Sequence, residues 1–398
     1  MAPSPERKLR VGVVIPFYHP VFGGAENQCR ALIKELSANG AVEFPFLLTR
    51  RKLPSFAPEE RIDGIRVIRF GPPGVSRWAH YGFLLALLWH LLRLGRDVDL
   101  IHCHATSLTG FFVTLAGRLL DRPVLLKLSS NGELSVGTRN LNGPDGHVVG
   151  RMRRAVSRFV SHNAAVVALN REGMSELNQT GCRQSYCLPN GVDSRRFHPV
   201  SIDERLALRR SLGLPEEAVI FLFTGRFVFS KGIDQLVKAF EIFITGRGEE
   251  NSILCLVGSG EGQAEAVDIP TAPEICSWSP VEDVSPLLQA ADVFVFPSRR
   301  EGLPNAVLEA LAVGLPCVLS NIEPHRELAE TNPQANIRFF PSGDAAALAA
   351  GLAQAYRDAT ARRLVAEVVI PTLEPVYLLE NIARGYLDIY RDLVDARS

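Results

Sequence analysis

Residues 293–310 read VFVFPSRREGLPNAVLEA and contain the pattern that decides the fold. The apolar run Val293 to Phe296 predicts a buried strand, because a continuous apolar run that ends at a turn signal is typical of parallel sheets. A loop rich in Gly and Pro follows, and the spacing of the apolar residues after it predicts a helix. The stretch therefore predicts a strand, a loop and a helix in succession, which is one step of an α/β fold.

The same alternation continues on both sides of this stretch in a chain of 398 residues. Short apolar runs that predict strands lie at residues 9–15, 44–48, 65–70, 100–103, 124–128 and 165–168, and again at 219–224, 253–257, 275, 293–296 and 317–319. Longer helical patterns separate them. Because the alternation restarts after a break at Cys187 to Asp193, the sequence predicts two Rossmann-like domains with parallel sheets.

The predicted domain boundaries follow from that break. We expect a first domain over residues 1–190, a second over 191–370 and a C-terminal helix within 371–398. The apolar positions at helical spacing in this last segment are Tyr377, Ile382, Tyr386, Ile389 and Tyr390. Either domain is a candidate for the surface against which this helix packs.

The composition is that of a soluble globular protein, with 46% apolar and 22% charged residues. Met1 to Arg10 lacks the apolar core of a secretory signal, and the seven cysteines lack the spacing of a disulfide framework or metal knuckle. The longest apolar stretch, Trp78 to Leu94, contains His80, His90 and Arg93, so we expect a buried helix rather than a membrane span. These features predict a cytoplasmic protein.

The two halves of the chain differ in charge. Residues 1–190 hold 24 Lys and Arg against 14 Asp and Glu, and the remaining residues hold 19 against 29. This asymmetry favours an anionic partner for the first half, and solvated, scattered arginines are the alternative. Candidates for peripheral contact with an anionic membrane are Arg77, Trp78, Arg151, Arg153, Arg154 and Arg158. We expect no nucleic-acid partner.

Two loops that follow predicted strands have residues suited to an anion. Gly23 and Gly24 open a helix after the first strand, where backbone N–H groups and the helix dipole attract negative charge. Arg226 and Lys231 lie in a glycine-bounded loop after residues 219–224, and two cations there suit a diphosphate. The structural alternatives are a plain turn and a solvated basic loop.

Two carboxylates belong to the stretch quoted first. Glu301 lies on its loop and Glu309 in its helix, and the loop residues after Glu301 are Gly302, Leu303, Pro304 and Asn305. The separation allows one carboxylate to reach sugar hydroxyls and the other to reach ribose hydroxyls, while the N–H groups between them face an anion. Ordinary surface charge is the alternative.

A metal site is not expected. His102 and His104 share one face of a predicted strand, and Asp97 with Asp99 matches a loose Asp-x-Asp pattern. No third ligand converges with them in the sequence, so we interpret these four residues as structural.

Four motifs in chain order resemble glycosyltransferase family 4, of the group 1 type. They are Gly23-Gly24-Ala25-Glu26, Pro189-Asn190-Gly191-Val192-Asp193, Gly225-Arg226 with Lys231-Gly232, and Glu301-Gly302-Leu303-Pro304-Asn305 with Glu309. The resemblance covers most of the chain. It implies a GT-B fold, in which two Rossmann-like domains face a central cleft. It also implies a retaining, metal-independent glycosyltransferase that needs no cofactor and uses a nucleotide diphosphate sugar.

The resemblance further implies a role for each matching residue. Arg226 and Lys231 would hold the diphosphate, Glu309 the ribose, and Glu301 with the amides of residues 302–305 the donor sugar. Gly24 would approach the phosphate from the first domain, and the base would lie near residues 276–278. The implied acceptor is a saccharide or a lipid-linked sugar, as in polysaccharide biosynthesis.

One position departs from the family pattern. A His-Gly pair usually follows the strand at residues 124–128, and this chain has Ser129-Ser130-Asn131-Gly132 instead. Asn131 can hydrogen-bond a sugar hydroxyl but cannot act as an imidazole does. Two alternatives therefore stay open: a catalytically weak nucleotide-sugar-binding protein, and another GT-B enzyme such as an epimerase.

Overall fold

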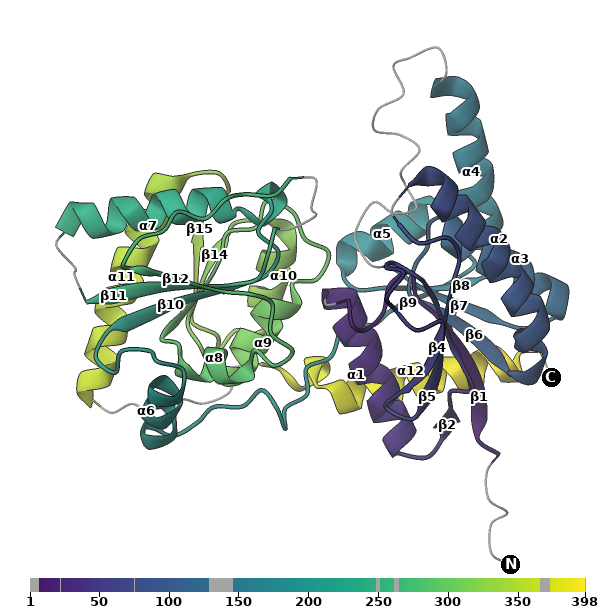
Figure 1. The fold of residues 1–398 in the computed structure, drawn as a ribbon, viewed down its shortest axis with the longest axis horizontal. Coiled ribbons are helices and arrows are strands. Elements are labelled where there is room, and N and C mark those ends of the chain that lie inside the picture. Colours follow the sequence, from purple (N-terminus) through teal and green to yellow (C-terminus); the bar gives the residue numbers. More distant parts are fainter. Residues whose placement is uncertain are drawn as a thin grey trace, which may run out of the picture. The chain divides into compact units, whose positions relative to one another are not determined.

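The computed structural model describes residues 7–21, 23–74, 76–128, 146–247, 251–260, 265–365 and 373–397. The chain divides into two compact units, one of residues 1–191 with 379–398 and one of residues 192–378 (Figure 1). Each unit is a largely parallel sheet covered by helices, so the prediction of two Rossmann-like α/β units is confirmed. Asn131 lies outside the described residues.

The sheet of the first unit has the strand order β4-β5-β3-β1-β6-β7-β8-β9, and β2 pairs with the start of β1. Its strands are β1 (Leu9–Val14), β2 (Val42–Glu43), β3 (Leu47–Arg50), β4 (Glu59–Ile62), β5 (Ile65–Phe70), β6 (Leu100–Cys103), β7 (Val124–Lys127), β8 (Ala165–Ala168) and β9 (Gln184–Cys187). All the pairings are parallel except that of β4 with β5. Asp63 and Gly64, with φ of 50° and 84°, form the tight turn between these two strands.

Helices cover both faces of this sheet. They are α1 (Gly24–Ala38), α2 (Arg77–Leu94), α3 (Leu108–Leu120), α4 (Gly146–Asn163), α5 (Arg171–Gln179) and α12 (Leu379–Asp395). One core lies under α1 and α12, and a second lies under α2, α3, α4 and α5. The expected C-terminal helix therefore packs in the first unit, and its Ile382, Tyr386, Ile389 and Tyr390 are buried.

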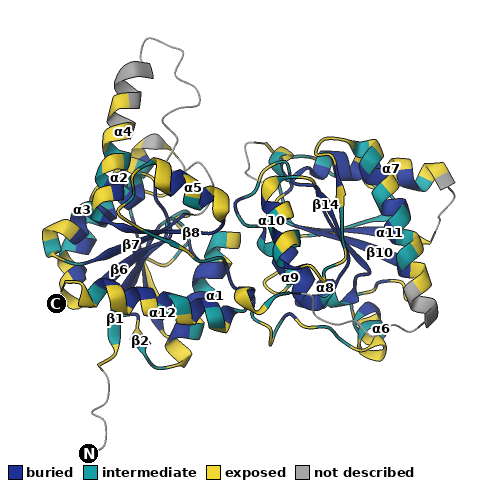
Figure 2. Ribbon diagram, turned by 180° about the vertical axis from the view of Figure 1, so that it is seen from behind, coloured by how far each residue is buried: buried dark blue, intermediate teal, exposed yellow. Residues whose placement is uncertain are grey.

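Helix α2 corrects one prediction. The sequence predicted that residues 78–94 form a buried helix, but one side of α2 is open to solvent (Figure 2). Trp78 on that side is 85% exposed. An apolar helix that lacks a polar stripe gives no sequence signal for which side faces solvent.

The sheet of the second unit has the order β12-β11-β10-β13-β14-β15, and all its pairings are parallel. Its strands are β10 (Val219–Thr224), β11 (Ser252–Val257), β12 (Ile275–Trp278), β13 (Val293–Phe296), β14 (Cys317–Ser320) and β15 (Ile337–Phe340). Its helices are α6 (Ile202–Ser211), α7 (Ile233–Arg247), α8 (Ser285–Ala290), α9 (Asn305–Val313), α10 (Glu323–Thr331) and α11 (Ala345–Val365). The four central strands are buried almost throughout, as Figure 2 shows, which explains their continuous apolar runs.

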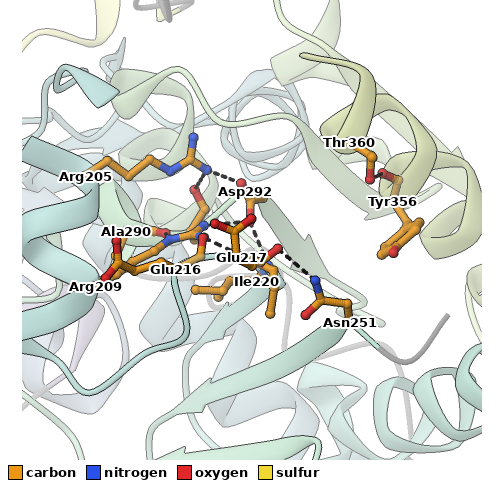
Figure 3. Close-up of polar contacts among 12 residues, drawn as sticks. Arg205, Arg209, Glu216, Glu217, Ile220, Asn251, Ala290, Asp292, Tyr356 and Thr360 are labelled. Carbon is orange, nitrogen blue, oxygen red and sulfur yellow. Dashed lines mark hydrogen bonds and ion pairs between the residues drawn. The ribbon is translucent and has the colours of Figure 1, made fainter. Parts of the chain in front are cut away.

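A buried ion-pair network ties α6 to the amino-terminal ends of two strands (Figure 3). The Arg209 guanidinium is 1% exposed and donates to the Asp292 carboxylate at 2.7 Å and to the Ala290 carbonyl at 2.9 Å. Asp292 also accepts from Arg205 and, at 2.8 Å, from the backbone N–H of Ile220. Since both buried charges are compensated, the network anchors α6 at the amino-terminal ends of the strands.

Candidate functional site

The candidate site lies where the strand order of the second unit reverses. Strands β10 and β13 are neighbours in the sheet, but the chain visits β11 and β12 on one side before it crosses to β13. Open α/β sheets bind ligands beyond the carboxyl ends of the strands at such a switch point. Arg226 and Lys231 follow β10, and Glu301 follows β13.

Close backbone packing joins these two loops. Gly232 ends the short 3₁₀ turn Phe229–Lys231 with φ of 70°, and a Cβ atom there would lie 2.0 Å from the Pro297 carbonyl oxygen. The Arg299 backbone N–H donates to the Ser230 carbonyl at 2.9 Å, and its guanidinium donates to both Asp234 oxygens at 2.6 and 2.7 Å. We call residues 225–232, after β10, the cationic loop and residues 297–304, after β13, the carboxylate loop. These contacts hold the two loops in one arrangement.

Lys231 and Glu301 form an ion pair across the two loops. The Lys231 Nζ donates to Glu301 Oε1 at 2.6 Å and to Oε2 at 2.8 Å, and the Ser298 hydroxyl donates to Oε1 at 2.5 Å. The two charged side chains are 18% and 7% exposed. The Lys231 ammonium also lies 5.5 Å from the centre of the Phe296 ring. The two residues that were predicted to bind different parts of a donor thus bind each other.

Two further polar residues support this pair from below. The Ser320 hydroxyl donates to the Ser298 carbonyl, and His325 Nδ1 lies 2.8 Å from the Ser320 carbonyl oxygen. Burial lowers the pKa of His325 to about 4, so the imidazole is neutral at physiological pH. Sequence reasoning gave no role to Ser298, Ser320 or His325, and the last two come under the loop only through the pairing of β13 with β14.

Helix α9 begins directly beside the carboxylate loop. Its N-cap residue is Pro304, whose side chain makes no cap hydrogen bond, and its first turn contains no acidic residue. The positive end of the helix dipole therefore lacks a compensating carboxylate of its own, which favours an anionic ligand there. This agrees with the expectation that the amides of residues 302–305 face an anion.

Glu309 lies one turn further along α9. Burial is the main cause that raises its pKa to about 7; nearby Asp283 also raises it, and Arg196 opposes the rise. Arg196 is itself paired with Asp283, with Nε 2.8 Å from a carboxylate oxygen. Glu309 is only partly buried as a whole residue. Its carboxyl group has a pKa near neutral pH and can accept hydrogen bonds from hydroxyl groups when ionised.

The remaining predicted donor residues of the second unit lie on or near the loops at this switch point. Arg226 is exposed at the start of the cationic loop. The neighbouring Gly258 has φ of 153°, and a Cβ atom there would lie 1.8 Å from the Gly225 carbonyl oxygen, so the loops after β10 and β11 are also in close contact. Residues 276–278, expected near the base, form part of the edge strand β12.

The predicted residues of the first unit lie at the start of α1. Gly23 precedes this helix in an extended conformation, and a Cβ atom on it would lie 2.3 Å from a Glu26 carboxylate oxygen. Gly24 is exposed at the first helical position. The Glu26 carboxylate, from the same turn, therefore lies next to the backbone at this end of the helix.

Two of the four residues interpreted as structural, His102 and Asp99, have hydrogen-bond partners that fit this interpretation. His102 and His104 are buried, and His102 Nδ1 lies 2.7 Å from the Tyr390 hydroxyl. Asp99 accepts hydrogen bonds from Arg7 and from the backbone of Arg10. Among the residues that the structure describes, no three His, Cys, Asp or Glu side chains gather as metal ligands.

Comparison with known proteins gives two family matches. Residues 204–367 match the family described as glycosyl transferases group 1, and residues 23–191 match the glycosyl transferase 4-like domain. The first match includes the loops after β10 and β13, and the second spans most of the first unit. Together they cover most of the chain.

Individual relatives are distant. The 2-deoxystreptamine N-acetyl-D-glucosaminyltransferase of Streptomyces fradiae is 27% identical, over 96% of this chain and 96% of its own. A glycosyltransferase proposed for teichuronic acid biosynthesis in Bacillus subtilis is 27% identical over 63% of this chain, and the chain spans only 60% of that relative.

Solved structures share the fold over nearly the full length. Sucrose-phosphate synthase from Thermosynechococcus elongatus has a TM-score of 0.75 at 21% identity, covering 98% of this chain and all of its own. Anabaena HepE, solved in complex with UDP and glucose, has a TM-score of 0.70 at 16% identity, covering 96% and 99%. At such identities the likeness concerns the arrangement of the strands and helices.

Proposed function

Because this chain belongs to the group 1 glycosyltransferases with the GT-B fold, we propose that it transfers a sugar from a nucleoside diphosphate donor to a saccharide or lipid-linked acceptor. Transfer proceeds with retention of the anomeric configuration and without a metal ion. The observation that carries the proposal is the Lys231–Glu301 pair beside the start of α9, whose first turn contains no acidic residue. Cation, carboxylate and helix dipole converge there at the strand switch point.

A donor diphosphate can replace the internal partner of the lysine. Phosphate oxygens accept from the Lys231 ammonium as a carboxylate does, so the bound diphosphate competes with Glu301 for it. The released Glu301 carboxylate then accepts hydrogen bonds from hydroxyls of the donor sugar. The resting ion pair thus keeps both groups compensated until the donor arrives, which avoids an unpaired charge in a largely buried place.

The chemical step breaks the bond between the anomeric carbon and the β-phosphate oxygen. The acceptor oxygen forms its new bond on the same face of the sugar, and the acceptor hydroxyl proton goes to the departing phosphate oxygen. Negative charge develops on the diphosphate as the bond breaks, and Lys231, Arg226 and the amides at the start of α9 stabilise it. The chain supplies electrostatic stabilisation and orientation in this scheme, without a covalent intermediate.

Glu309 gives the site its preference for a nucleotide. Its carboxyl group accepts hydrogen bonds from the ribose hydroxyls in this proposal. Burial disfavours the ionised form of this group, and the hydroxyl donors stabilise that form. HepE, whose fold this chain shares, was solved with UDP, which makes UDP and UDP-sugars the first probes. Composition and cysteine usage support a cytoplasmic location as part of the same proposal.

The test is a panel of nucleoside diphosphates and nucleotide sugars, scored by thermal stabilisation and by slow donor hydrolysis without acceptor. We expect one nucleotide series to stabilise the protein and its sugar to be hydrolysed slowly. Lys231→Ala should abolish both signals, and Lys238→Ala, which changes an exposed lysine of α7, should keep both. Stabilisation without hydrolysis or transfer would indicate a binding protein, and no stabilisation by any nucleotide would refute the proposal.

A further inference from the structure

Helix α2 (Arg77–Leu94) presents apolar side chains to solvent as well as to the core. Its inner side buries Phe83, Leu84, Leu87 and Leu91. Its outer side carries Trp78, Tyr81, Leu85 and Trp89, which are 85%, 51%, 66% and 55% exposed. Large apolar side chains that gather on one exposed surface mark a contact site, whereas single ones do not.

The four outer residues form one continuous stripe. They are separated by three, four and four positions, so that they follow one side of the helix for nearly its full length. The next residue of the same series is Arg93, whose guanidinium lies 5.4 Å from the centre of the Trp89 ring. Tryptophan and tyrosine have an apolar body and a polar edge, which suits them to a boundary between water and an apolar phase.

The helices beside this stripe are basic. Helix α3 (Leu108–Leu120) packs against both α2 and α4 (Gly146–Asn163), and the three helices cover the same face of the sheet (Figures 1 and 2). In sequence they contain seven arginines and no aspartate or glutamate: Arg77, Arg93, Arg118, Arg151, Arg153, Arg154 and Arg158. The exposed residues Arg151, Arg154, Arg158 and His162 form a stripe on α4, with the spacing of the aromatic stripe on α2.

An apolar stripe on α2 and a basic stripe on α4, the two helices that flank α3, identify the occupant by its chemistry. Anionic lipid headgroups attract arginines, and the layer beneath them takes up tryptophan, tyrosine and leucine side chains. Among the described residues, no helix is long and apolar enough to cross a bilayer. A helix that lies in the plane of the interface needs no such length, because it buries only one side.

We propose that α2 lies in the interface of an anionic membrane, with Trp78, Tyr81, Leu85 and Trp89 among the lipids and the arginines of α4 on the headgroups. The inference does not rest on the proposed transferase activity. It gives that activity a place, since a lipid-linked acceptor would meet the protein at the same surface.

The experiment measures binding of the full chain to vesicles. Vesicles of neutral phosphatidylcholine, with and without anionic phosphatidylglycerol, are sedimented with the protein at low and high salt. We expect binding to the anionic vesicles, weakened several-fold by salt because exposed charge contacts are screened. Trp78→Ser with Trp89→Ser should lower the partition coefficient at least about tenfold, since two large apolar groups leave the interface.

Two further variants separate the parts of the surface. Arg154→Gln with Arg158→Gln should lower binding about fivefold for each arginine and reduce the salt dependence. The matched control is Ile202→Ser with Phe339→Ser, which removes exposed apolar side chains of the second unit and should leave binding unchanged. All these positions are solvent-exposed, so the variants should fold, and their melting temperatures check this.

Depth is read from tryptophan fluorescence. The chain has three tryptophans, Trp78, Trp89 and Trp278. Brominated lipid should quench the wild-type protein, and Trp78→Phe with Trp89→Phe should remove the quenching while membrane binding persists. Absence of binding to anionic vesicles at low salt would overturn the proposal. Equal binding by the double serine variant would overturn it too. So would a wild-type dimer that does not bind vesicles and that the double serine substitution dissociates.

Discussion

The Lys231 ammonium lies 2.6 and 2.8 Å from the two carboxylate oxygens of Glu301, and the two residues come from loops that follow neighbouring strands. Each charge compensates the other. A donor must therefore exchange one ion pair for another, rather than bind to a free cation. This exchange gives opposite effects for the removal of the two partners.

Lys231→Ala should weaken UDP binding and lower turnover about 10²- to 10³-fold, because it removes a donor from the developing negative charge. Glu301→Ala should lower turnover similarly but bind UDP at least as tightly as the wild type, since the lysine no longer has an internal competitor. Calorimetric titration with UDP and turnover assays with the full donor separate the two effects. A similar loss of UDP affinity in both variants would show that Glu301 holds the nucleotide as well.

Gly232 should be needed for the shape of the site beyond its backbone conformation. Gly232 and Gly213 have φ of 70° and 67°, so alanine at either position pays a similar backbone penalty of about 1 kcal/mol. A Cβ atom at Gly232 meets the Pro297 carbonyl at 2.0 Å, whereas at Gly213 it meets no atom within 4 Å.

We therefore expect Gly232→Ala to destabilise the protein more than Gly213→Ala and to reduce UDP binding, because the two loops must separate. Urea denaturation gives the stabilities, and the thermal shift with UDP gives the binding. Equal behaviour of the two variants would mean that the loop after β13 relaxes without consequence for the site.

Much of the fold could be predicted because buried parallel strands leave a clear mark in the sequence. Residues 219–224 and 293–296 were predicted with the observed boundaries, since both strands are apolar throughout. The edge strand β4 was missed because its residues, Glu59 to Ile62, are mostly charged and exposed. The Asp63-Gly64 turn after it was the available signal for a hairpin.

The site was predictable only residue by residue. Motifs located Lys231, Glu301 and Glu309, but their mutual contacts depend on the order of strands in the sheet, which the local sequence does not encode. The ion pair of Lys231 with Glu301 and the position of His325 beneath it follow from that order. The roles given to these residues toward a donor stay predictions.

Arg209→Ala should destabilise the second unit by about 3–5 kcal/mol, because it removes the more deeply buried of the two arginines that pair with the Asp292 carboxylate. Arg210→Ala is the matched control, since the neighbouring Arg210 is exposed and pairs with Glu216 at 3.1 Å. We expect a loss of at most about 1 kcal/mol for the control, as for other surface ion pairs. Urea denaturation followed by circular dichroism measures both, and a loss below about 1 kcal/mol for Arg209→Ala would contradict the anchoring role.

Glu309 should make both stability and nucleotide binding depend on pH. Its pKa in the folded protein is raised to about 7 from the usual 4.5, so between these values the folded state binds more protons than the unfolded state. The free energy of unfolding must then fall as pH rises through this range. Glu309→Gln removes the titrating group, so its stability relative to the wild type should increase from pH 5 to pH 8.

Nucleotide binding should show the opposite trend. If ribose hydroxyls donate to the ionised carboxylate, UDP binds the wild type more tightly as pH rises through about 7, and Glu309→Gln binds weakly without that dependence. The comparison between the two proteins cancels the titration of UDP itself. Denaturation and UDP titrations at pH 5, 6, 7 and 8 provide both measurements, and Glu241→Gln on the exposed side of α7 is the control. A parallel pH profile for wild type and Glu309→Gln would place the ribose elsewhere.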